Sequence, residues 1–254
     1  MHPKSPILCG KNTITGTKSS SDTGIKLVNK TPEAERLHFL PPVFFVKSHF
    51  ATRASQQISE TGKKRMSRIL MPIGDATEAL DTFYPFFRLK EAGYKVVVAA
   101  PEARLIHTVL HEIPPDSSIP WDITQERPGY FIQADIAFRD LQADDYAGVF
   151  ISGGRAPEYI RYDQDLNRVI HEMNAAGKPI ASVCHGIEIL TSARILQDRK
   201  VTTVAKCAMD AEQGGGIYID QETVVDGNLV SARTWHDNAP LMKTFLEMLA
   251  SADA

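Results

Sequence analysis

From Ser67 onward, short apolar runs alternate with amphipathic segments of helical spacing. Four of the runs are rich in Val and Ile, have the length of a strand, and lie at 68–73, 94–100, 146–152 and 179–184. The segments at 75–93 and 163–177 place apolar residues three and four positions apart, which is typical of helices. Strands that are joined by helices pair in parallel and cover both sheet faces. The pattern therefore predicts an α/β fold with a doubly wound, mostly parallel sheet.

The segment 75–93 is expected to be a helix that packs on this sheet. Asp75 and Glu78 have the spacing of a capping box, and Gly93 favours the end of the helix. Pro85 is expected to kink or divide it, because proline lacks the backbone donor that a helix interior uses. The expected buried face consists of Leu80, Phe83, Tyr84 and Phe87.

The rest of the chain continues the alternation. Asp163 is expected to cap the helix in 163–177, and Gly177 to end it. Its expected buried stripe consists of Leu166, Val169, Ile170 and Met173. The pair Asp226–Gly227 predicts a hairpin, and Pro240 is expected to begin a last helix. Residues 102–145 break the rhythm, and their prolines indicate an insertion with a short hairpin.

The first 65 residues differ in composition from the rest of the chain. They hold 11 Lys and Arg against 4 Asp and Glu, whereas the remainder holds 17 against 27. They are polar and lack a strand or helix period, which predicts a disordered basic tail or sequence upstream of a native start at Met66. A targeting segment and a nucleic-acid role are both less favoured. Residues 66–254 are then one domain of ordinary size.

Cysteine content and hydropathy indicate where the protein resides. The three cysteines, Cys9, Cys184 and Cys207, form neither a CxxC pair nor an even disulfide framework, which favours a reducing cytoplasm. No apolar run approaches the length of a membrane helix, so no membrane partner is expected. His107 and His111 are four residues apart in a Pro-rich stretch without supporting ligands, and we interpret them as surface residues. No metal or cofactor is expected.

The strand at 179–184 ends in "VCHG", a pattern of particular chemical interest. Cys184 lies at the carboxyl end of a parallel strand, where such sheets bind ligands. Gly186 allows a sharp turn into the next helix, and Ser182 is small enough to lie beneath it, as in a nucleophile elbow. The helix N-terminus is expected to lower the pKa of the thiol. The alternative is an inert buried cysteine. His185 is expected to point away from Cys184, because successive helix residues do not face each other.

Other candidate residues follow the first and third strands. Glu78 and Asp81 come after the first strand, and a carboxyl that faces a thiolate would stay protonated and donate a hydrogen bond. Gly153 and Gly154 end the third strand and could offer backbone N–H groups as an oxyanion hole. Glu158 follows at the expected start of a helix. For each acid the alternative role is to stabilise a helix N-terminus.

Four stretches together resemble the ThiJ/PfpI family, and the likeness runs in order from about Ser67 to Leu249. They are "FYPFFRLKEAG", "GGRAPEY", "GKPIASVCHG" and "VVDGNLVSAR". The resemblance implies a flavodoxin-like, class I glutamine amidotransferase-like fold, a nucleophilic Cys184, a partner carboxylate after the first strand, and a homodimer or homohexamer. In PfpI-type members it also implies a His–Glu pair across subunits, here His185 and Glu158. Asp81 stands where most members carry glutamate.

These features favour a cysteine-dependent enzyme that acts on small carbonyl or glycated substrates, of the glutathione-independent glyoxalase or deglycase type. One alternative is an intracellular cysteine peptidase of PfpI type that uses His185 and Glu158. A second is a stress chaperone or redox sensor in which Cys184 is oxidised. A glutamine amidotransferase is not favoured, because it needs a late His-x-Glu and the only late histidine, His236, stands in "TWHDNAP".

Overall fold

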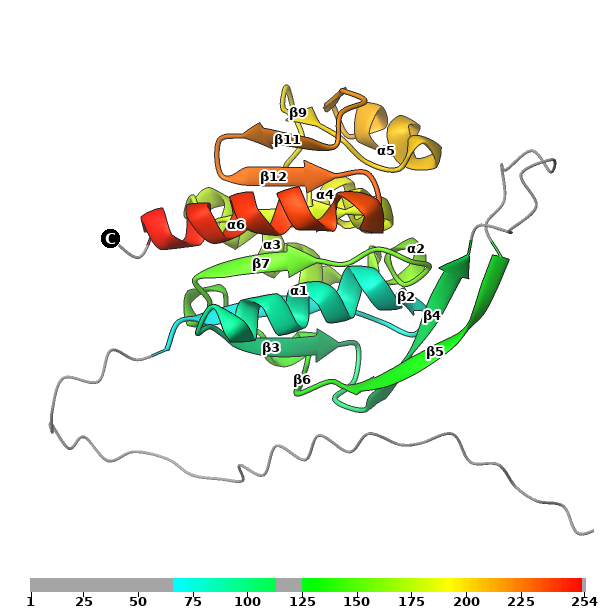
Figure 1. Ribbon diagram of the computed structural model, residues 1–254. Coiled ribbons are helices and arrows are strands. Elements are labelled where there is room, and N and C mark those ends of the chain that lie inside the picture. The colour runs from blue at the N-terminus through cyan, green and yellow to red at the C-terminus, as the bar shows by residue number, and fades with distance from the viewer. Residues whose placement is uncertain (1–65, 113–124, 253–254) are drawn as a thin grey trace, which may run out of the picture. The chain divides into compact units, whose positions relative to one another are not determined.

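The computed structural model describes residues 66–112 and 125–252 (Figure 1). The expectations for residues 1–65 lie outside these ranges. The central sheet contains β1 (Arg68–Pro72), β3 (Lys95–Ala100), β6 (Ile136–Ala137), β7 (Gly148–Ile151), β8 (Ile180–Val183), β11 (Thr223–Asp226) and β12 (Leu229–Ala232). Its order is β11-β12-β8-β7-β1-β3-β6, and every pairing is parallel except β11 with β12. The five strands from β3 to β12 follow the flavodoxin order 2-1-3-4-5, so the predicted fold class is confirmed.

Two smaller sheets flank the central one. The first contains β2 (Thr77–Glu78), β4 (Leu105–Glu112) and β5 (Gln125–Gln133), and the second β9 (Lys200–Val201) and β10 (Ile217–Tyr218). The β4–β5 pair is antiparallel and extends beside the N-terminal end of α1 (Figure 1). It is the hairpin predicted within 102–145, and it is longer than expected.

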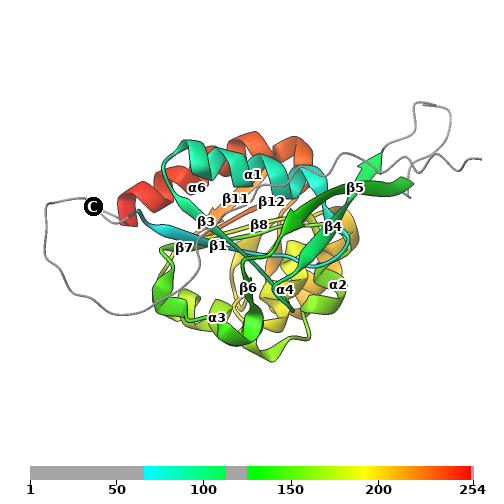
Figure 2. The same cartoon turned by 90° about the horizontal axis from the view of Figure 1, so that it is seen from below.

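Helices cover both faces of the central sheet (Figure 2). One face carries α1 (Ala79–Glu91) and α6 (Asn238–Ala252), and the other α2 (Pro157–Ile160), α3 (Gln164–Ala175), α4 (Ile187–Ser192) and α5 (Ala208–Gln213). The side chains of β1 alternate between two cores: Ile69 and Met71 face one, and Leu70 faces the other. Within the described residues, no helix combines the length and apolar composition needed to cross a membrane.

Most of the predicted helix ends and turns are present. The Asp163 side chain accepts from Leu166 N at 3.0 Å, and the predicted stripe of α3 is buried. Gly177 follows the helix with φ +68°, and Gly227 turns the β11–β12 hairpin with φ +57°. These are left-handed conformations that favour glycine. The last helix begins slightly early, at Asn238.

The start of α1 differs from the predicted one. Glu78 is the N-cap, and its side chain accepts from Asp81 N at 2.6 Å. Asp75 lies before the helix, where its carboxylate contacts Arg104 and accepts from His107 N at 3.2 Å. The Asp75–Glu78 capping box is therefore wrong. Pro85 lies inside one continuous helix and does not divide it.

The buried face of α1 only partly matches the predicted face, since Phe83 is partly buried against the core. Leu80 is 52% exposed and Phe87 60% exposed, whereas Leu89 is fully buried. The residues that face the protein are Ala79, Asp81, Thr82, Pro85 and Leu89. A hydrogen bond of 2.7 Å between the Thr82 and Ser152 hydroxyls fixes this rotation of the helix against β7. The buried polar contacts thus override the apolar spacing.

This rotation predicts opposite effects for two leucines of one helix. Leu89→Ala should lower the free energy of unfolding by about 2–5 kcal/mol, because it leaves a cavity in the core. Leu80→Ala, the matched control, should change it by less than about 0.5 kcal/mol, because its side chain is exposed. Urea denaturation of both variants measures this. A comparable loss at Leu80 would mean that a second copy of the chain covers this face in solution.

Candidate active site

The chain turns sharply at Cys184, between β8 and α4. Cys184 adopts a left-handed backbone with φ +56°, a conformation that is costly for a residue with a side chain. Thr203 Oγ1 donates to the Cys184 carbonyl at 2.6 Å and holds the turn. A Cβ on Gly186 would lie 2.7 Å from Ser182 Oγ and 3.0 Å from the Ile151 carbonyl oxygen, so only glycine fits without a shift. The elbow predicted from the sequence is present.

His185 lies against the thiol. Its Nδ1 is 3.3 Å from Cys184 Sγ. The expectation that His185 points away is therefore wrong, because the left-handed backbone of Cys184 removes the pair from regular helix geometry. Burial lowers the pKa of His185, which keeps the imidazole neutral near pH 7. A neutral imidazole at this distance can accept the proton of the thiol.

Burial dominates the ionisation of the thiol. It raises the pKa of Cys184 well above its ordinary value, and an ionised Asp81 would raise it further. The backbone N–H groups of His185 and Gly154 act in the opposite direction but do not prevail. The expected lowering of the pKa by the helix N-terminus is therefore not met. Cys184 is a thiol in the resting protein, and a base must activate it.

Asp81 and Cys184 flank the same glycine. A Cβ on Gly153 would lie 2.6 Å from Asp81 Oδ2 and 2.6 Å from Cys184 Cβ, so a side chain there would collide with both. Asp81 is fully buried, and its Oδ1 accepts from Asn238 Nδ2 at 3.2 Å. Oδ2 has no hydrogen-bond partner among the described residues. Gly153 thus acts as the spacer that lets the acid approach the cysteine.

The two acids of the first helical turn differ in protonation. Burial raises the pKa of Asp81 well above its ordinary value, and the charge of Glu78 raises it further. Burial raises the pKa of Glu78 only to about 7, because backbone N–H groups at the start of α1 favour its charged form. Asp81 is therefore the protonated carboxyl. Because Oδ1 accepts from Asn238 Nδ2, Oδ2 is the oxygen that is left to carry the proton.

A cluster of hydroxyl groups positions these acids. Thr77 Oγ1 lies 3.0 Å from Thr82 Oγ1 and 3.2 Å from Ser152 Oγ. Thr77 also forms an isolated bridge with Gly154, and Glu78 N donates to the Gly153 carbonyl at 3.1 Å. The loop after β1 is thereby joined to the end of β7. Isolated Thr and Ser residues carry no signal that could have revealed this cluster from the sequence.

Glu158 lies on α2, partly exposed, and pairs with Arg155. Arg155 Nε and Nη2 donate to its two oxygens at 2.5 and 2.9 Å. The negative charge of Glu158 raises the pKa of His185, but no hydrogen bond joins the two side chains in the described structure. The predicted His185–Glu158 pair is therefore not formed within one chain.

The β4–β5 hairpin also contributes residues near the site. His111 Nε2 lies 3.2 Å from Glu126 Oε2, and the His111 ring stacks on Trp235 with centroids 6.4 Å apart. The side chain of His111 is only 9% exposed, so its interpretation as a surface residue is wrong. A charge on His111 would lower the pKa of His185. The sequence placed His111 in an irregular stretch and gave no sign of these contacts.

Two shallow depressions lie elsewhere, at the opposite edge of the sheet. Their lining includes Arg68, Ala147 and Pro179, which stand at or next to the amino ends of β1, β7 and β8. Ligands of such sheets bind beyond the carboxyl ends of the strands. We therefore assign the site to the Cys184 edge.

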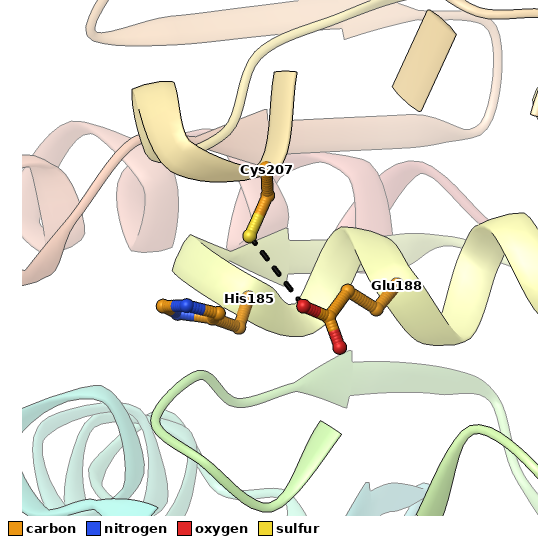
Figure 3. A group of neighbouring side chains, drawn as sticks. All are labelled: His185, Glu188 and Cys207. Carbon is orange, nitrogen blue, oxygen red and sulfur yellow. Dashed lines mark hydrogen bonds between the residues drawn. The ribbon is translucent and has the colours of Figure 1, made fainter. Parts of the chain in front are cut away.

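One group of potential metal ligands adjoins the site. It consists of His185, Glu188 and Cys207 (Figure 3). His185 thus belongs both to the thiol pair and to this group. The other predicted residues, Glu78, Asp81 and Glu158, do not take part in it.

Comparison with known proteins places the chain in a family. The family model described as the DJ-1/PfpI family matches residues 67–248. A protein named as a deglycase from Thermococcus kodakarensis is 35% identical over 182 residues, which cover 72% of this chain and 99% of the relative. A second, named deglycase PfpI, from Pyrococcus furiosus, is 34% identical with the same coverage.

A solved structure supports the fold in the same region. It is a two-domain protein from Anabaena variabilis with a DJ-1/ThiJ/PfpI-like and a ferritin-like domain. The TM-score is 0.60 at 27% sequence identity, and the match covers 72% of this chain and 50% of that chain.

The buried Glu78 predicts a pH-dependent stability. Its pKa of about 7 in the folded protein lies above the ordinary value of 4.5, so the folded state retains a proton that the unfolded state releases between these values. The stability of the wild type should therefore fall as pH rises through this window. Glu78→Gln keeps an oxygen acceptor for Asp81 N and removes the titration. Its stability relative to wild type should rise from pH 4.5 to 7 by at most about 3 kcal/mol.

Thermal or urea unfolding at several pH values measures this difference. Glu91→Gln, an exposed change on the same helix, is the matched control and should follow the wild-type profile. A constant gap between Glu78→Gln and wild type across the window would contradict the assignment.

Proposed function

The chain belongs to the DJ-1/PfpI family, and we propose that it is a cysteine-dependent enzyme that acts on reactive carbonyls, of the deglycase or glutathione-independent glyoxalase type. The observation that carries the proposal is the 3.3 Å contact between Cys184 Sγ and a neutral His185 Nδ1, beside a protonated Asp81. Relatives named as deglycases support the substrate class.

The first step creates the nucleophile. His185 Nδ1 takes the proton of Cys184 as the sulfur attacks the carbon that bears the hydroxyl and amine of an early glycation adduct. The C–S bond forms, the C–N bond breaks, and the protonated imidazole returns its proton to the leaving amine. A free dicarbonyl enters the same path by addition of the sulfur to its aldehyde. Both routes give a hemithioacetal on Cys184.

The second step moves hydrogen between adjacent carbons. A base removes the proton from the carbon that bears sulfur, and a proton is delivered to the neighbouring carbon, which converts the hemithioacetal into a thioester. In this relay neutral His185 can accept the proton and protonated Asp81 can deliver one, because Asp81 Oδ2 is unpartnered in the described structure and lies against Gly153, as Cys184 does. Water then hydrolyses the thioester, which releases a hydroxy acid and restores the thiol. An oxyanion role of Gly153 and Gly154 in these steps stays a prediction.

The proposal predicts turnover of methylglyoxal without glutathione, and release of amine from its adduct with an N-acetylated amino acid. Cys184→Ala should lower both rates by at least about 100-fold, because it removes the nucleophile. Cys207→Ser is the matched thiol control and should retain activity in buffer that contains a chelator. Lactate formation and free amine are the measured products.

Casein is assayed beside these substrates. Hydrolysis of casein without turnover of either carbonyl substrate would favour the peptidase alternative. Full carbonyl activity in Cys184→Ala would overturn the mechanism.

We also propose that the protein is a homodimer or homohexamer, and that Glu158 of one copy reaches His185 of another. Within one chain, Glu158 pairs with Arg155 and forms no hydrogen bond to His185 in the described structure. The exposed apolar residues of α1, with Tyr130 of β5 against Phe83, offer a surface that a second copy would bury.

Complementation tests the shared site. Cys184→Ala and Glu158→Ala should each be weakly active alone. Co-refolded mixtures should regain activity, because some sites then combine an intact Cys184–His185 with an intact Glu158. A mixture of Cys184→Ala and His185→Gln is the matched control and should regain nothing. If mixed oligomers form without recovery, Glu158 does not act across an interface.

A further inference from the structure

We propose that His185, Glu188 and Cys207 form a binding site for a divalent transition-metal ion of the zinc class. One potential ligand atom from each side chain lies within 4.8 Å of the others. Figure 3 shows the Cys207 sulfur directed at a Glu188 oxygen, with the His185 ring beside them. Imidazole nitrogen, carboxylate oxygen and thiolate sulfur are the ligand types that zinc takes in proteins.

The backbone brings the three ligands together. His185 lies in the 3-10 turn Cys184–Gly186, and Glu188 lies three residues later, in the first turn of α4, so their side chains project to the same side of the chain. Cys207 ends the 3-10 turn Ala205–Cys207, and its Sγ donates to Glu188 Oε1 at 3.6 Å. Metal–ligand bonds of about 2.0–2.3 Å would place ligand atoms about 3.5 Å apart. Side-chain rotations that move the ligand atoms by about 1 Å would close the remaining distance.

The burial of this group indicates a prepared site and not a chance surface cluster. Glu188 is 6% exposed and Cys207 2% exposed. Glu188 Oε2 has no hydrogen-bond partner among the described residues. A buried carboxylate needs a counter-charge, and Glu188 shares its counter-charge, Arg161, with Asp210. The proposed function uses neither Glu188 nor Cys207.

The positive charge of Arg161 near Glu188 would oppose binding of a cation, but its contact with Asp210 offsets this. Arg161 Nη1 lies 3.4 Å from Glu188 Oε2 but closer to Asp210 Oδ1, at 3.0 Å. Asp210 therefore balances the guanidinium. The contact with Oε2 leaves Oε1 turned toward Cys207, as supporting residues orient metal-bound carboxylates. The charges of Glu188 and a Cys207 thiolate then neutralise a divalent ion.

Binding has a chemical consequence for Cys184. The ion displaces the proton of Cys207 to water and forms a metal–sulfur bond, with no change of oxidation state. It also takes one nitrogen of His185. If that nitrogen is Nδ1, the base is occupied; if it is Nε2, the neutral ring carries its proton on Nδ1. In both cases His185 cannot accept the proton of Cys184, so the ion inhibits the thiol chemistry.

Metal titration of the full chain tests the site independently of any substrate. In a Cys9→Ser background, calorimetry should show one equivalent of Zn²⁺ bound. Co²⁺ should give a thiolate-to-metal charge-transfer band, and ¹¹³Cd NMR a shift typical of a single sulfur ligand. Cys207→Ser should abolish the band and weaken Zn²⁺ binding at least about tenfold, and Glu188→Gln should weaken it similarly.

Two matched variants control for other ligands. Cys184→Ser removes a neighbouring thiol, and His111→Gln a neighbouring imidazole; both should keep the band and the stoichiometry. A band that persists in Cys207→Ser and disappears in Cys184→Ser would overturn the proposal, and so would a ¹¹³Cd shift without a sulfur ligand in the wild type. These readouts need no turnover, so failure of the proposed reaction and failure of the metal site are distinguishable.

Discussion

The left-handed backbone of Cys184 is the constraint on which the rest of the site depends. It ends β8 abruptly and brings the imidazole of the next residue to 3.3 Å from the sulfur. The conformation is costly and is held by what surrounds it, chiefly the Thr203 hydroxyl on the Cys184 carbonyl and the lack of a side chain at Gly186. A regular helix start would have separated Cys184 from His185.

A second constraint is the shared burial of the acids and the thiol. Glu78 and Asp81 lie three residues apart, yet only Glu78 accepts backbone N–H groups at the helix start, so Asp81 holds its proton more tightly. The lack of a side chain at Gly153 leaves room for both this protonated acid and the Cβ of Cys184. The geometry thus assigns different states to two similar side chains through solvation and hydrogen bonding alone.

The sequence predicted the features that depend on local spacing. The strands, the Asp163 cap, the Gly177 end and the Cys184 elbow each follow from a few adjacent residues. The rotation of α1 could not be predicted, because it depends on a hydroxyl contact between Thr82 and Ser152, seventy positions apart in the chain. The contact of His185 with the sulfur was missed for a related reason. It depends on the left-handed φ of Cys184, and the residue type at position 184 does not predict that angle.

The protonation of the site bears on which chemistry it favours. Cys184, His185 and Asp81 are all neutral at rest, so charge develops only when the proton of Cys184 moves to His185. Peroxide reacts with thiolates, and a buried neutral thiol is a poor sensor for it. A carbonyl adduct, in contrast, needs proton transfer concerted with attack, and a neutral thiol, a neutral imidazole and a protonated carboxyl supply that in one place. The burial of the neutral thiol thus favours the proposed carbonyl chemistry over oxidation of Cys184.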